Sequence, residues 1–218
     1  MLSGRVAKVV WSFILGATVV EGAALGYSFR PHGNWLVTVW RYSMHPPGTP
    51  AAWCFAAMIM GAYVAHAARR SPVIRHYAFR PDYWRPFAAL RLVAILMALV
   101  TGFFEELMFR KVFMDYAAAS GYGVALQILV SAVTFGAVHA IWGLFAGKLR
   151  AAMAAMIATG ALGGLLALDY IIGNRSLAPC AAAHIGINLI LEPWLILTAV
   201  SDCWGKASMP PAWAAPTR

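Results

Sequence analysis

The sequence predicts an all-α integral membrane protein, a bundle of about six transmembrane helices. Two observations favour this fold class. Of the 218 residues, 61% are hydrophobic and only 11% are charged, whereas a soluble domain of this size carries about 25% charged residues. The apolar residues also gather in runs of about 20, the length that crosses a bilayer core. We expect spans at about 9–28, 51–68, 87–109, 123–147, 151–173 and 178–200.

The first span, 9–28, follows Arg5 and Lys8 in the manner of a secretory signal peptide. The apolar core of a signal peptide is only about 7–15 residues long, and this run is longer and contains Glu21. We therefore expect a helix that stays in the protein. Because the six spans use most of the chain, we expect residues 1–200 to form one polytopic membrane domain. The proline-rich residues 201–218 then form a cytoplasmic tail.

The connections between the spans predict the orientation in the membrane. On one side the cations are Arg5, Lys8, Arg69, Arg70, Arg75, Arg80, Arg85, Lys148, Arg150, Lys206 and Arg218. On the other side they are Arg30, Arg41, Arg110, Lys111 and Arg175. By the positive-inside rule this excess predicts that both termini are cytoplasmic. The rule also accounts for the net charge of +9, so we expect no nucleic-acid partner. The Ala-, Arg- and Trp-rich composition is typical of a GC-rich bacterial genome. We therefore expect the protein to lie in a bacterial inner membrane.

Spans four and five contain Gly143-xxx-Gly147 and Gly160-xxx-Gly164, a spacing that lets helices approach closely. Ionisable residues within lipid are more informative, because each costs roughly 2.5–3.5 kcal/mol on insertion scales and is by default a functional candidate. The candidates are Glu21, His66, Glu105, Glu106, His139, Asp169, His184 and Glu192.

The third span ends on the sequence TGFFEELMFR, residues 101–110. Glu106 and Arg110 stand at i, i+4 and can pair on one helix face. Glu105 points about 100° away from that face and is free to meet another group. Taken alone, this pattern equally fits a buried ion pair that only orients two helices.

The fourth and sixth spans contain FGAVH, with Phe135 and His139, and HIGIN, with His184 and Asn188 at i, i+4. Each histidine alone is typical of packing or of an interhelical hydrogen bond. Polar groups in lipid seek each other, so the three motifs together predict one shared cavity. There a glutamate and a histidine can take a proton from water, and a histidine with an asparagine can stabilise an oxyanion. These are the groups needed to hydrolyse an amide.

In this order along the chain, Glu-Glu-xxx-Arg, Phe-xxx-His and His-xxx-Asn resemble the motifs of the CAAX prenyl protease II/ABI (CPBP) family of intramembrane proteases. The resemblance covers about 100–190. It implies an intramembrane endopeptidase that acts on a membrane-anchored or C-terminally tagged protein, near its C-terminus. It also implies that Glu105 and His139 activate water, that His184 and Asn188 form the oxyanion site, and that Glu106, Arg110 and Phe135 support them.

Three alternatives stay open from the residues. Glu105, His139 and His184 would suit a catalytic zinc ion, although HExxH is absent and asparagine is a poor zinc ligand; we favour a mechanism without a cofactor. Cys180 and His184, at i, i+4, would suit a cysteine protease. A non-catalytic scaffold or a proton-coupled transporter would use the same buried residues together with Glu21, Asp169 and Glu192.

The charge bias also raises a question of sidedness. With both termini inside, His184 lies about 9 Å from the outer end of its span at 1.5 Å per residue. Enzymes of the CAAX type work on the cytoplasmic side. The charge bias instead predicts a site near the outer face. The expected substrate is then not a prenylated CAAX tail but an exported or membrane-anchored protein with a C-terminal sorting signal.

Overall fold

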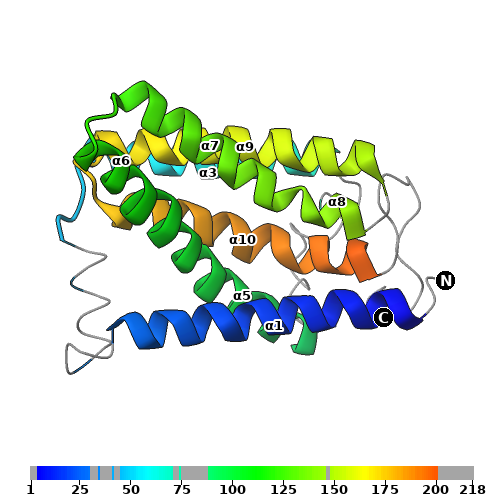
Figure 1. The fold of residues 1–218 in the computed structure, drawn as a ribbon. Coiled ribbons are helices and arrows are strands. Elements are labelled where there is room, and N and C mark those ends of the chain that lie inside the picture. Colours follow the sequence, from blue (N-terminus) through cyan, green and yellow to red (C-terminus); the bar gives the residue numbers. More distant parts are fainter. Residues whose placement is uncertain are drawn as a thin grey trace.

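The computed structural model describes the backbone of residues 4–29, 34, 41, 45–70, 74, 88–145 and 148–200. Among these, the side chains at 4–10, 28–29, 88–91, 145 and 194–200 are not described. All regular structure in the described residues is helical (Figure 1). The predicted tail, 201–218, lies outside the described residues.

The helices follow the predicted spans in order. They are α1 (Gly4–Phe29), α3 (Pro50–Arg70), α5 (Ala88–Glu106), η3 (Leu107–Met114), α6 (Asp115–Ala119), α7 (Val124–His139), α8 (Ile141–Phe145), α9 (Leu149–Ile172) and α10 (Leu177–Val200). The segments Pro50–Arg70, Leu92–Ala119, Val124–Leu144 and Leu149–Ile172 are long and apolar enough to cross a membrane, and Leu177–Pro193 is a shorter apolar helix. The all-helical membrane fold is confirmed.

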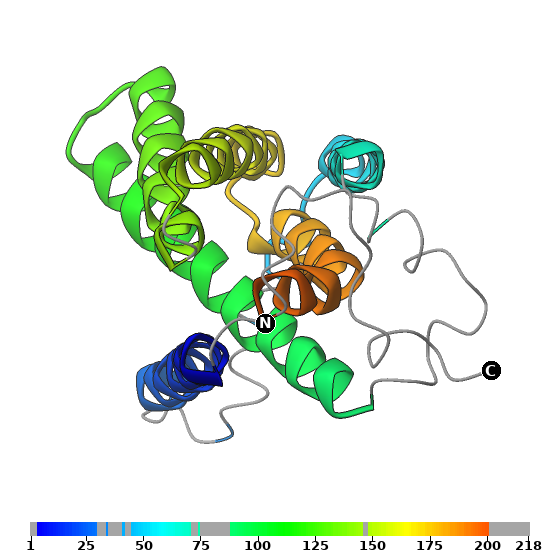
Figure 2. The same ribbon diagram turned by 90° about the vertical axis from the view of Figure 1, so that its right-hand side faces the viewer.

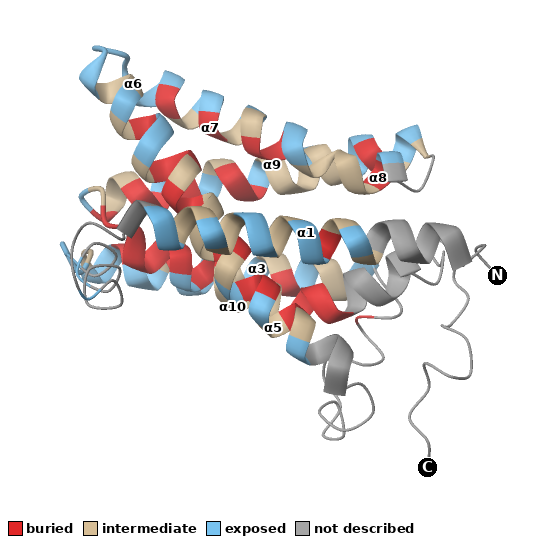
Figure 3. Cartoon of the chain, turned by 60° about the horizontal axis from the view of Figure 1, so that its bottom comes forward, coloured by how far each residue is buried: buried red, intermediate tan, exposed pale blue. Residues whose placement is uncertain are grey.

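The outer faces of the bundle are apolar, as a lipid-facing surface requires. Val19, Val20 and Ile157 leave more than two thirds of their area exposed. Buried residues concentrate on the inward faces of the helices (Figure 3). Seen along the bundle, α10 lies near the centre, against α3, α5 and α9 (Figure 2).

Small residues bring the helices together. A Cβ at Gly136 of α7 would lie 2.9 Å from the Cα of Gly160 of α9, so these two helices touch backbone to backbone. A Cβ at Gly102 of α5 would lie 3.1 Å from the Ile185 side chain of α10. Glycine at 102 therefore lets α5 approach α10 one helical turn before the glutamate pair.

The third span differs from the prediction in its length and geometry. After Glu106 the helix widens into the π-helix η3 and then continues as α6 to Ala119. π-helical turns are rare and frequently occur at functional sites. The fourth span also differs, because it breaks after His139 at Ala140 and resumes as the short helix α8.

The α6–α7 and α9–α10 connections lie at one end of the bundle and the α8–α9 connection lies at the other (Figure 1). At the first end, Arg175 donates to Asp115 at 2.6 Å and to Gln127 at 2.7 Å. Tyr170 donates to the same Asp115 carboxylate at 3.0 Å. We call these four residues the end clamp, since they join α6, α7 and α9 to the α9–α10 turn.

Candidate active site

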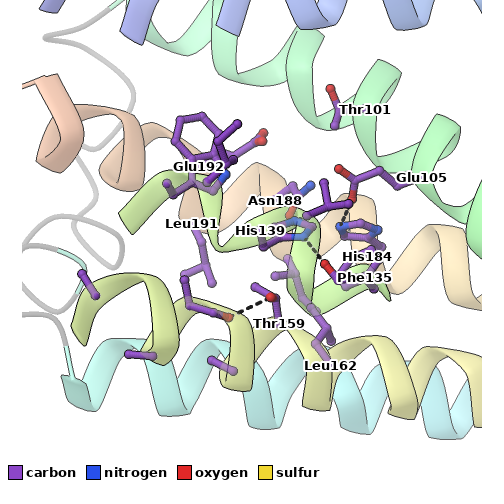
Figure 4. Close-up of a pocket in the computed structure, with 18 of the residues that line it drawn as sticks. Thr101, Glu105, Phe135, His139, Thr159, Leu162, His184, Asn188, Leu191 and Glu192 are labelled. Atoms are coloured by element: carbon purple, nitrogen blue, oxygen red, sulfur yellow. Dashed lines mark hydrogen bonds and ion pairs between the residues drawn. The ribbon is translucent and has the colours of Figure 1, made fainter. Parts of the chain in front are cut away.

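Four predicted site residues line one cavity of about 890 Å³. Glu105 comes from α5, His139 from the last turn of α7, and His184 and Asn188 from α10 (Figure 4). The break after His139 places this residue at the end of α7 rather than within a longer helix. The three motifs, far apart in sequence, therefore converge.

The Glu105 carboxylate lies between the two imidazoles. Its Oε2 atom is 3.8 Å from Nε2 of His139 and 3.7 Å from Nε2 of His184. Both distances exceed a direct hydrogen bond and are of the length that a water molecule can bridge. Oε2 is buried and has no hydrogen-bond partner among the described residues. Three polar atoms thus converge on one point of the cavity.

The other nitrogen of each imidazole is held by a fixed acceptor. Nδ1 of His139 lies 2.8 Å from the Phe135 carbonyl, and a carbonyl can only accept, so this nitrogen carries the proton. Nδ1 of His184 donates to the buried Glu106 carboxylate at 2.7 Å. Both rings are therefore oriented with Nε2 toward Glu105.

Glu106 and Arg110 form the ion pair that their spacing predicts. Nε of Arg110 is 3.0 Å from Oε2 of Glu106, and both side chains are fully buried. The atoms are close without an aligned N–H···O geometry, so the contact is ionic. Arg110 also donates from Nη2 to the Gly163 carbonyl of α9 at 3.2 Å. Glu106 is thus held between Arg110 and His184.

Phe135 is the packing partner of these groups and is completely buried. Its ring centroid is 4.5 Å from that of His139 and 5.5 Å from that of His184. The Arg110 guanidinium lies over the same ring at 4.9 Å. One aromatic ring therefore packs against Arg110 and both imidazoles.

The cavity is elongated along the helices. Its lining on α9 runs from Leu162 to Arg150, about 18 Å at 1.5 Å per residue. Lys148 and Arg150 line the end at the α8–α9 connection, which the charge bias assigns to the cytoplasm. Glu105 lies at the other end of this path. The cavity therefore connects the predicted site with the cation-rich end of the bundle.

The cavity also contains residues to which the family resemblance assigns no role. Glu21 and Glu192 line it, and so does Thr101, which the sequence analysis did not single out. Thr101 stands one turn before Glu105, so the i−4 spacing was the available signal. Asp169 and Cys180 are buried but are not part of the lining. Sγ of Cys180 instead contacts the Leu177 carbonyl at 3.2 Å.

The alternative of a catalytic zinc ion would require Glu105, His139 and His184 to act as its ligands. Within the described ranges, no group of three or more His, Cys, Asp or Glu side chains is arranged to hold a metal ion.

Residues 87–190 match the family described as type II CAAX prenyl endopeptidase Rce1-like. This segment contains all three motifs, so the match confirms the resemblance. Neither a curated protein nor a solved structure matches the chain significantly.

Proposed function

Because residues 87–190 belong to the Rce1-like family of type II CAAX prenyl endopeptidases, we propose that this integral membrane protein is an intramembrane endopeptidase. It hydrolyses a peptide bond of a membrane-associated protein, near the C-terminus of that protein. We further propose that it resides in a bacterial inner membrane with both termini in the cytoplasm. The chemistry is assigned to Glu105, His139, His184 and Asn188.

In the proposed mechanism a water molecule lies between Glu105 and the two Nε2 atoms. Glu105, assisted by His139, takes a proton from this water as its oxygen attacks the substrate carbonyl. The negative charge that forms on the carbonyl oxygen is met by the Asn188 amide and by protonated Nε2 of His184. The Glu106 carboxylate stabilises that imidazolium through Nδ1. The proton held by Glu105 then passes to the leaving amine.

The observation that carries this proposal is the position of Glu105 Oε2. A buried carboxylate oxygen without a partner is costly, and here it faces two oriented imidazole nitrogens 3.7 and 3.8 Å away. Glu106, by contrast, meets Arg110 and His184 directly. The cavity beside it, about 890 Å³, has room for a peptide segment.

The path of the cavity also bears on sidedness. It runs from Glu105 to Lys148 and Arg150, at the end that we assign to the cytoplasm. We propose that the substrate enters from this end. The site residues can then lie near the outer ends of their spans and still act on a substrate that arrives from the cytoplasm.

The test is Glu105→Gln, which keeps size and shape but cannot accept the proton. The variant should unfold at the wild-type temperature in detergent and cleave lipid-anchored peptides in liposomes about 10²–10⁴-fold more slowly. His139→Ala should give a similar loss, and the double variant should be little worse than either, because residues that act as one unit are non-additive. Wild-type cleavage rates in Glu105→Gln would refute the proposal.

A metal-dependent reaction gives a separate outcome. Peptide cleavage should persist after exhaustive chelation, with metal analysis confirming that the protein has lost its metal. If chelation abolishes cleavage and stoichiometric zinc restores it, Glu105, His139 and His184 are zinc ligands and the water-activating role of Glu105 is wrong.

A second candidate, a proton-coupled transporter, is favoured by the carboxylates of Glu21 and Glu192 in the same cavity. A proton path does not need the Asn188 amide, whereas an oxyanion site does. Asn188→Ala therefore separates the two candidates: proton uptake that persists without peptide cleavage would favour the transporter.

A further inference from the structure

We propose that Glu21, Thr101 and Glu192 form a cation-binding subsite that selects substrates with a lysine or arginine side chain about two residues from the scissile bond. We call these three residues the acidic subsite. The inference rests on the proposed endopeptidase function and adds a substrate preference to it.

The first argument is the order of residues along α10. His184, Asn188 and Glu192 stand at i, i+4 and i+8, and all three line the cavity (Figure 4). Asn188 and Glu192 are separated by about 6 Å along the helix. An extended peptide advances about 3.3 Å per residue. A substrate whose carbonyl oxygen meets Asn188 therefore brings a residue about two positions away to the level of Glu192.

The second argument comes from the facing helices. Thr101 stands one turn before Glu105 on α5, displaced toward the α8–α9 end of the cavity. Its hydroxyl donates to the Glu21 carboxylate of α1 at 2.6 Å. Glu21 of α1 and Thr101 of α5 therefore line the same cavity as Glu192 of α10. A substrate that enters past Arg150 meets these groups before it reaches Glu105.

The third argument is charge. Glu192 is only 8% exposed, and its Oε2 atom has no hydrogen-bond partner among the described residues. The lysines and arginines in the described cavity lining are Lys148 and Arg150, at the start of α9. Between them and Glu105 the lining presents carboxylates and no cation. Hydrogen bonds to a charged group are among the strongest in proteins, so a substrate ammonium or guanidinium suits this position.

A cationic side chain would also favour the proposed reaction. Glu105 must be ionised to accept a proton, and two further carboxylates in the same low-dielectric cavity oppose its negative charge. A substrate cation between Glu21 and Glu192 offsets that repulsion. A substrate without one leaves the repulsion in place, so selection would act in catalysis as well as in binding.

The experiment uses the full chain in liposomes and lipid-anchored peptides in which one lysine is scanned through three positions on each side of the cleaved bond. The matched peptides carry norleucine, which has no charge. The wild type should prefer lysine at one position by about tenfold to hundredfold in kcat/KM. Glu192→Gln should bring this ratio close to one.

Asp169→Asn is the matched control, because Asp169 is also a buried carboxylate without a hydrogen-bond partner among the described residues but does not line the cavity. It should keep the lysine preference. If Glu192→Gln does not fold, Glu21→Gln should reduce the same ratio. A wild type that cleaves lysine and norleucine peptides alike, or a preference that survives both variants, would overturn the inference.

Binding separates this inference from the proposed function. The same peptides are titrated against the Glu105→Gln protein and its Glu105→Gln/Glu192→Gln double variant, and affinity is read from fluorescence anisotropy. Tighter binding of the lysine peptide that Glu192→Gln removes supports the subsite, even if the wild type cleaves no peptide and the endopeptidase proposal fails. Equal binding of both peptides to Glu105→Gln contradicts the subsite, whatever the cleavage assay shows.

Discussion

Two polar clusters in this bundle use similar side chains in opposite ways. In the end clamp, the Asp115 carboxylate is met by Arg175 at 2.6 Å and by Tyr170 at 3.0 Å. In the candidate active site, Oε2 of Glu105 has no hydrogen-bond partner among the described residues, and the nearest imidazole nitrogens are 3.7 and 3.8 Å away. The Asp115 carboxylate therefore has direct hydrogen-bond partners, whereas Oε2 of Glu105 has none among the described residues.

The difference teaches how to separate structural from functional polar groups in a membrane protein. A buried polar group is stabilising only when its hydrogen bonds are made. Substitution of polar groups that have direct partners, such as those of the end clamp and the Glu106–Arg110 ion pair, should mainly lower the amount of folded protein. Substitution of polar groups that face the cavity without a direct partner should mainly lower turnover. Three substitutions test this division, from the largest expected effect to the smallest.

Arg110→Ala should have the largest effect, on folding. Removing one partner of a buried ion pair costs about 3–5 kcal/mol, because the other charge is left buried and unpaired. The variant should yield much less folded protein in detergent and unfold at a lower temperature. Lys111→Ala is the matched control, since the neighbouring Lys111–Asp115 pair is part-exposed at 3.5 Å and such pairs are worth about 0–1 kcal/mol. Normal folding of Arg110→Ala with lost turnover would instead place Arg110 in the chemistry.

Asn188→Ala should leave folding almost unchanged and raise the activation free energy by about 2.7–4 kcal/mol, the usual loss for an oxyanion donor. This corresponds to about a hundredfold to a thousandfold in kcat. Thr159→Ala is the control, because Thr159 lines the same cavity but bonds to the Ala155 carbonyl of its own helix at 2.7 Å. Equal kcat values for the two variants would contradict the oxyanion role.

Tyr170→Phe should have the smallest effect. It removes one hydrogen bond of the end clamp and should lower the free energy of unfolding by about 0.5–1.5 kcal/mol. The kcat should be unchanged, because the Tyr170 side chain is not part of the cavity lining. A thermal unfolding scan in detergent and a cleavage assay on the same preparation measure both. Loss of turnover at unchanged stability would show that the end clamp is coupled to the site.

The sequence by itself determined the order and approximate positions of the apolar helices, because the length of an apolar run is a direct consequence of bilayer thickness. It also determined the Glu106–Arg110 pair, which is found at 3.0 Å. Residues four apart share a helix face, so this contact depends on backbone geometry within one helix. The family match over residues 87–190 agrees with the motifs for the same reason: their order and spacing are local features of the chain.

Only the tertiary structure decided which side chains of different helices lie close together. The approach of α5 to α10 depends on the space left at Gly102, and the position of His139 depends on where α7 ends. The widening of the helix after Glu106 has no signal in a single sequence. The Phe-xxx-His motif indicated a supporting role for Phe135 but not its contact with both imidazoles. Glu21, Thr101 and Glu192 are also far apart in the chain and come together only in the cavity. Interhelical packing sets these distances, and no local periodicity encodes them.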